Sequence, residues 1–112
     1  MILKIDSIVK SKEPKGECIL LEGLKDTNLQ GFAIIAETEE KNTHNASHLF
    51  KFPEWQVKQG DYVRIYTGLG TPKTKRNLLE SKTHFFYWEN ESSFFSKKAG
   101  NIELVQYKSE NK

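Results

Sequence analysis

The stretch from Leu49 to Tyr66 decides the fold, and it reads LFKFPEWQVKQGDYVRIY. Apolar and polar side chains alternate at both of its ends, over 49–52 and over 61–66, and a period of two is typical of an extended strand. Pro53 and Gly60 lie in the connector between these ends, where both residue types favour a bend. The stretch therefore predicts two strands joined as a hairpin.

The second of these strands has two unlike faces. The alternation of side chains sends Val63 and Ile65 to one side of a sheet. Tyr62, Arg64 and Tyr66 then point to the opposite side. We therefore expect one face of this strand to be buried in a core and the other to stay amphipathic.

Extended patterns recur along the rest of the chain. They cover 2–9, 17–24, 29–35, 84–88 and 102–107. We interpret 37–47 as a polar loop, because it has no apolar face, and 67–83 as a long connection. Phe94 and Phe95 are expected to form a short buried anchor, and 109–112 to fray. Because no amphipathic helix accompanies the strands, the sequence predicts an antiparallel β-sandwich.

Length and composition set the limits of this fold. The chain has 112 residues, which suit a single domain over 1–112 with a hydrophobic core. Its charges nearly balance, with a formal net charge of +2, so the overall charge favours no class of partner. The one cysteine, Cys18, lies in the apolar run 18–21. We expect its thiol to pack as a small buried group.

The N-terminal segment bears on location. In the first six residues, MILKID, charged residues interrupt the apolar ones too early to leave the apolar middle of a secretory signal. No apolar run approaches the roughly eighteen residues that a membrane-spanning helix requires. We therefore expect a cytoplasmic protein without membrane contact.

Four motifs follow one another along the chain, DTNLQGFAI at 26–34, HLFKFP at 48–53, VKQGDYVRI at 57–65 and AGNIEL at 99–104. In their order and spacing they resemble the lamin-tail domain, and the resemblance covers 17–107. The first two resemble the family's Asp-x-x-Leu-x-Gly-Trp-x-Leu element and its aromatic-x-Phe-Pro strand end. The last two are similar to its Leu-x-Pro-Gly-x-x-Val-x-Val hairpin and its closing Gly-Asp-x-x-x-Leu strand.

The chain departs from this family pattern at several positions. Phe32 stands where the family has Trp, Gln59 where it has Pro, and Asn101 where it has Asp. Phe94 and Phe95, with the serine after them, occupy the place of a Trp-Asn pair. The resemblance implies an immunoglobulin-like β-sandwich of about seven to nine strands. It implies no catalytic residue and no cofactor, and a role in binding proteins, nucleic acid or cell-surface structures.

Sites for enzymatic chemistry find little support in the residues. His44 and His48, with His84 and the glutamates of 37–40, contain suitable zinc ligands, but a spacing of four joins two side chains only on a helix. No Gly-x-Ser-x-Gly element accompanies the histidines. The Gly-Leu-Gly of 68–70 lacks the Lys-Ser or Lys-Thr of a phosphate-binding loop. We expect a protein that is not an enzyme and binds no metal.

The long connection is the candidate region for nucleic-acid binding. Against the single carboxylate of Glu80 it carries four cations, Lys73, Lys75, Arg76 and Lys82. Such cations contact phosphates, and exposed rings stack on bases. The rings available on the neighbouring strands are Tyr62, Tyr66 and Tyr87. Weak, sequence-independent binding through 73–82 is therefore one hypothesis.

Protein binding is the other hypothesis, and the sequence favours it. Edge strands of a sandwich accept a partner strand, and exposed aromatic rings beside an arginine anchor one. The candidate binding residues for the two hypotheses are Arg64, Tyr66, Lys73, Lys75, Arg76 and Lys82. The overall prediction is a non-catalytic, lamin-tail-like binding or structural module that acts through protein contacts, as a monomer or weak homo-oligomer.

Overall fold

The computed structural model describes residues 2–9, 16–39, 45–78, 80–89 and 99–107. The secondary-structure elements that these residues form are all β-strands, as the alternation of apolar and polar residues predicts. Among these residues there is no helix long and apolar enough to cross a membrane.

The described residues form ten strands, more than the seven to nine expected. They are β1 (Leu3–Val9), β2 (Cys18–Gly23), β3 (Thr27–Asn28), β4 (Phe32–Glu39), β5 (Asn45–Lys51), β6 (Gln56–Val57), β7 (Tyr62–Tyr66), β8 (Lys73–Arg76), β9 (Lys82–Tyr87) and β10 (Ala99–Gln106). Strands β3 and β6 have two residues each, and a segment this short shows no period in a sequence.

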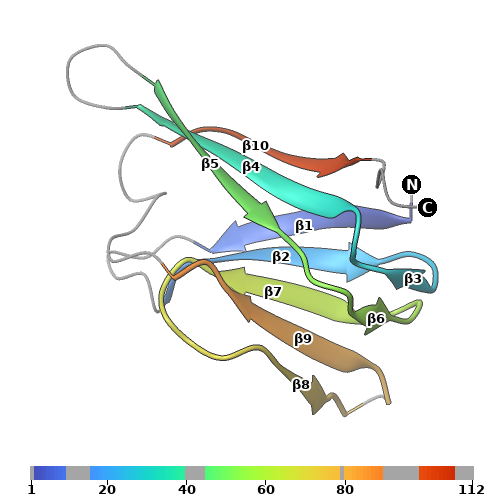
Figure 1. The fold of residues 1–112 in the computed structure, drawn as a ribbon. Helices are drawn as coiled ribbons and strands as arrows, with labels where there is room; N and C mark the ends of the chain where they lie inside the picture. The colour runs from blue at the N-terminus through green and yellow to red at the C-terminus, as the bar shows by residue number, and fades with distance from the viewer. Residues whose placement is uncertain (1, 10–15, 40–44, 79, 90–98, 108–112) are drawn as a thin grey trace.

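The strands assemble into three sheets (Figure 1). The largest has five strands in the order β1-β2-β7-β9-β8, and in Figure 1 it fans out from β1 to β8. The second has three strands in the order β10-β4-β5. Strand β3 pairs with β6 in a separate two-stranded sheet.

One hydrophobic core joins the two larger sheets. Its members from the five-stranded sheet include Leu3, Ile19, Leu21, Val63, Ile65 and Phe86. Its members from the three-stranded sheet include Phe32, Ile34 and Ala36. Alternate residues of β2, β4 and β7 enter this core, which confirms the burial predicted for Val63 and Ile65. Two sheets that share one core are compatible with a β-sandwich.

The hairpin predicted for 49–66 is wrong. Strand β5 pairs with β4, whereas β7 pairs with β2 and β9, so the two strands belong to different sheets. The connector is fastened instead to the segment of β3. The Asn28 side chain accepts a hydrogen bond from the backbone N–H of Trp55 at 3.0 Å, and the backbone N–H of Leu29 donates to the Trp55 carbonyl at 2.8 Å. Pro53 has no N–H with which to extend β5, so the chain leaves that sheet.

Two further expectations hold only in part in the five-stranded sheet. The sandwich was expected to be antiparallel, which holds for the other strand pairs of the described residues, but β7 and β9 pair in parallel. The long connection at 67–83 contains β8, which pairs with β9 in the antiparallel direction. All four residues of β8 are exposed and none is apolar, so no hydrophobic period marks this strand in the sequence.

The remaining loop predictions have mixed outcomes. The polar loop expected at 37–47 is shorter than predicted, because β4 continues to Glu39 and β5 begins at Asn45. The ends of these two strands pair through backbone hydrogen bonds, which polar residues form as well as apolar ones do. The anchor predicted at Phe94 and Phe95 and the fraying end at 109–112 lie outside the described residues.

Candidate functional site

Three aromatic rings form a row on the outer face of the five-stranded sheet. The Tyr66 ring lies nearly parallel to the Phe85 ring, with 6.3 Å between centroids and 8° between planes. It lies in the same way beside the Tyr87 ring, at 5.7 Å and 17°. Parallel pairing puts Tyr66 opposite Tyr87, so side chains of β7 and β9 emerge at the same level. We call Tyr66, Phe85 and Tyr87 the aromatic row.

Lysines of the edge strand β8 border the aromatic row. Lys73 pairs with Phe85 across the ladder, and its Nζ lies 5.6 Å from the centroid of the Phe85 ring. Lys75 pairs with Thr83, two residues further along β8. The two lysines, the aromatic row and Leu69 line a hollow of about 360 Å³. This hollow combines ring surfaces with cationic groups.

The Tyr87 ring packs directly against the backbone of Gly70. A Cβ at this position would overlap three carbons of the ring, so any other residue would push the ring aside. Gly70 therefore has a packing role at the border of the hollow.

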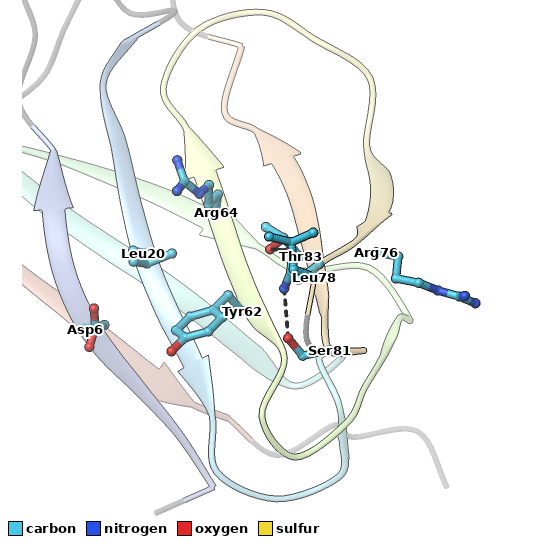
Figure 2. Close-up of a pocket in the computed structure, with 9 residues that line it drawn as sticks. Asp6, Leu20, Tyr62, Arg64, Arg76, Leu78, Ser81 and Thr83 are labelled. Carbon is cyan, nitrogen blue, oxygen red and sulfur yellow. Dashed lines mark hydrogen bonds between the residues drawn. The ribbon is translucent and has the colours of Figure 1, made fainter.

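A larger cleft continues from the aromatic row along β7. Its volume is about 770 Å³, and its lining includes Leu20 of β2 with Tyr62 and Arg64 of β7. Figure 2 shows the phenol ring of Tyr62 directed toward the strand that carries Leu20. Arg64 donates a hydrogen bond from Nη1 to the Tyr66 hydroxyl at 3.3 Å. This arginine therefore links the cleft to the aromatic row.

The turn between β8 and β9 forms one wall of the cleft. Asn77 holds this turn together, because its Nδ2 donates to Ser81 Oγ and its Oδ1 accepts from Thr83 Oγ1, each at 2.9 Å. Leu78 of the same turn is fully exposed at the rim. Arg76 also lines the cleft, and in Figure 2 its guanidinium points away from the other labelled side chains.

The thiol of Cys18 lies next to this surface. Cys18 pairs with Tyr66 across β2 and β7, and it is buried as predicted. Burial raises the pKa of the thiol, and the neighbouring Arg64 and Tyr66 offset only part of that rise. A thiol that stays protonated at neutral pH is a poor nucleophile.

A polar network lies on the inner side of the same sheet. Asp61 and His84 are buried, with 2.8 Å between Asp61 Oδ2 and His84 Nε2. The backbone N–H groups of Lys58 and Lys82 also donate to the Asp61 carboxylate, each at 3.0 Å. Burial alone would raise the pKa of Asp61, but the hydrogen bonds from His84, Lys58 and Lys82 outweigh it and hold the pKa below its ordinary 3.8.

The second imidazole nitrogen of His84 acts as an acceptor. Trp55 Nε1 lies 2.9 Å from His84 Nδ1, and Thr74 Oγ1 lies 3.0 Å from the same atom. An indole N–H can only donate, so Nδ1 carries no proton and Nε2 donates its own to Asp61.

The order Thr74, His84, Asp61 resembles a hydroxyl nucleophile, a base and an orienting acid. However, the indole N–H of Trp55 already donates to the lone pair of His84 Nδ1, which a base would use, and His84 is only 4% exposed. The geometry therefore favours a structural role, in which the network fastens Trp55 and β8 to the centre of the sheet.

Four of the six candidate binding residues from the sequence gather on the outer face, where Tyr66, Lys73, Lys75 and Arg64 line the hollow and the cleft. Arg76 also lines the cleft, but its guanidinium points away from the others (Figure 2). Lys82 lies apart from them, in a depression that it shares with Lys58 and Glu80.

The residues considered as a zinc set do not come together. His84 is bound to Asp61 in the five-stranded sheet, and His48 lies on β5 in the other sheet. His44 lies outside the described residues. In the part of the chain that the structure describes, no three His, Cys, Asp or Glu side chains are close enough to hold a metal ion.

The sequence reasoning missed Phe85 and the cleft. Tyr87 was named among the available rings but Phe85 was not, and both are half-buried and face outward. The strand period contained the signal, because an inward Phe86 requires outward neighbours. No comparable signal marks the cleft, whose lining comes from five strands and a turn.

Neither a comparison with protein-family models nor a search of curated proteins finds a match to this chain. The function must therefore be inferred from the residues of the outer face.

Proposed function

We propose that this chain is a non-catalytic binding domain with a lamin-tail-like, immunoglobulin-like fold, and that the outer face of its five-stranded sheet binds single-stranded nucleic acid. The observation that carries the proposal is the aromatic row with Lys73 and Lys75 directly beside it. Proteins that bind single strands without sequence preference combine rings that stack on bases with cations that contact phosphates.

The spacing of the cations supports this ligand. Lys73 and Lys75 are two residues apart on β8, so their side chains leave the same side of the strand about 6.6 Å apart. Arg64 adds a cation between the aromatic row and the cleft. A chain of regularly spaced phosphates matches such a row of cations better than a single anion does.

Composition limits the strength of this binding. With a net charge of +2, the protein has little long-range attraction for a polyanion. We expect dissociation constants of about 10⁻⁴ to 10⁻⁶ M at physiological salt, the range of non-specific binding. Each base that stacks on a ring contributes about 1–3 kcal/mol.

The test is fluorescence anisotropy with a labelled single-stranded oligonucleotide of mixed sequence, titrated at several salt concentrations. The double variant Lys73→Gln/Lys75→Gln should weaken binding. It should also flatten the slope of log K against log salt by about 0.7 for each phosphate that the variant no longer neutralises. No binding of the wild-type chain at low salt would overturn the proposal.

A matched control separates the site from net charge. Lys25 and Lys58 are also exposed lysines, and neither lines the hollow or the cleft. The variant Lys25→Gln/Lys58→Gln loses the same charge and should bind nearly as well as the wild type. Equal weakening in both double variants would mean that only net charge matters, which contradicts a site on the outer face.

Protein binding is the second candidate function, and a different edge favours it. Strand β1 is an edge of the five-stranded sheet, and its residues Ile8 and Val9 are 37% and 46% exposed. An edge strand with exposed apolar side chains can accept a strand from another protein. Substitution of Ile8 by Lys should abolish binding of a partner at this edge and leave oligonucleotide binding unchanged.

A further inference from the structure

The outer face has two lysines at one end, Arg64 in its middle and, beside the mutually paired Lys4 and Glu22, the carboxylate of Asp6 at the other end. Lys73 and Lys75 lie on β8, and Asp6 lies on β1. The strand order β1-β2-β7-β9-β8 separates these edges by four strand spacings, about 19 Å. A phosphate is attracted to the β8 end and repelled from the β1 end. A bound strand therefore has its backbone near β8 and its bases toward β1.

The cleft lies on the base side of this arrangement. Figure 2 shows Asp6, Leu20 and Tyr62 on three neighbouring strands at the edge of the cleft nearest β1. Leu20 offers an apolar surface and Tyr62 a ring, the two surfaces on which a base packs. At about 770 Å³ the cleft has ample room for a base.

The polar groups of the cleft differ in what remains available to a ligand. Asn77, Ser81 and Thr83 bond to one another in the turn wall. The exposed carboxylate of Asp6 is an acceptor only, and the Arg64 guanidinium is a donor only. A base that lies against Asp6 must therefore offer a hydrogen-bond donor, such as an amino group.

Building on the proposed function, we infer that the cleft selects bases that carry an exocyclic amino group, through the Asp6 carboxylate. Cytosine offers its N4 amino group, which aspartate accepts. Thymine has the acceptor O4 at the same place, so its oxygen would face the carboxylate oxygens without a hydrogen between them. The wild-type chain should therefore bind oligo(dC) more tightly than oligo(dT), by about fivefold, the value of one modest base contact.

The test compares the two homopolymers, at equal length and equal salt, by fluorescence anisotropy. Asp6→Asn should bring the ratio of the two affinities close to one, because an amide can donate to thymine O4 as well as accept from cytosine N4. Asp6 is exposed, so circular dichroism and the thermal midpoint should match the wild type.

Glu22→Gln is the control for charge alone. Glu22 is a carboxylate on β2 that lies 3.7 Å from Lys4 Nζ and does not line the cleft. Removing its charge should change both affinities equally and leave their ratio intact. If neither homopolymer binds, the proposed function itself is wrong. If both bind equally to the wild type, or if Asp6→Asn keeps the preference for oligo(dC), base selection by Asp6 is wrong while nucleic-acid binding stands.

Discussion

The two faces of β9 are built from neighbouring residues and have opposite roles. His84 and Phe86 point inward, where Phe86 is 1% exposed in the core and His84 is bonded to Asp61. Phe85 and Tyr87 point outward into the aromatic row. The comparison teaches that aromatic content by itself does not identify a core, since a step of one residue separates a ring packed in the core from a ring on the outer face.

The largest effect should come from the inner face. Phe86→Ala removes a fully buried ring that contacts Phe52 and Trp55, with centroid distances of 5.3 and 5.0 Å. We expect a loss of about 3–5 kcal/mol in the free energy of unfolding, measured with urea at neutral pH. A loss below about 1 kcal/mol would mean that the inner face does not carry the stability of the sheet.

The next effect should come from the buried carboxylate. Asp61→Asn removes a charged group that accepts three hydrogen bonds, and we expect the free energy of unfolding to fall by about 1.5–3 kcal/mol at neutral pH. The folded pKa of Asp61 is depressed, so its stabilising contribution is present above 3.8 and is lost as the pH falls through the lower folded value.

Urea unfolding over a series of pH values checks this sign. The difference in stability between the wild type and Asp61→Asn should be constant near neutrality and shrink below pH 3.8. A difference that grows as the pH falls would contradict an ionised Asp61 in the folded state.

A smaller effect is expected where the network reaches the edge strand. Thr74→Val keeps the branched shape that suits a strand and removes the hydroxyl that lies 3.0 Å from His84 Nδ1. We expect a loss of about 0.5–1.5 kcal/mol in the free energy of unfolding, because the indole N–H of Trp55 still donates a hydrogen bond to His84 Nδ1. A loss as large as that of Asp61→Asn would show that Thr74, and not Trp55, is the main partner of Nδ1.

The smallest effect on stability should come from the outer face. Phe85→Leu keeps an apolar side chain at a half-buried position, and we expect a change of about 0.5 kcal/mol or less in unfolding. Oligonucleotide binding should nevertheless weaken by about 1–3 kcal/mol, the contribution of one base stacked on a ring. Loss of stability without loss of binding would reverse the roles assigned to the two faces.

The sequence predicted what depends on short-range periodicity. The strand character of most segments and the inward orientation of Val63 and Ile65 follow from a period of two. The partners of β5 and β7 do not follow from it, because pairing depends on contacts between distant segments, such as Asn28 with Trp55. Strand β8 was missed because an exposed edge strand of lysines has no apolar residue to reveal its period.

The candidate site was predictable only in part, for the same reason. The sequence pointed to Lys73 and Lys75 and to the rings of Tyr66 and Tyr87, but not to Phe85 or to the stacking of the three rings. Those rings become neighbours through the parallel pairing of β7 with β9, two segments separated by the whole of 67–81. The cleft depends in addition on Asp6 and Leu20, which belong to the first quarter of the chain.

The parallel pairing of β7 with β9 also sets which part of this sheet opens first. The connection between them passes through β8, whose one neighbour in the sheet is β9. Strand β8 can therefore detach without breaking the β7–β9 ladder or uncovering Phe86. Amide hydrogens of β8 should exchange with solvent deuterium well before those of β2 and β7, and a bound polyanion should slow that exchange. The edge proposed to meet the phosphates is thus also an edge that can open without disturbing the core of the sheet.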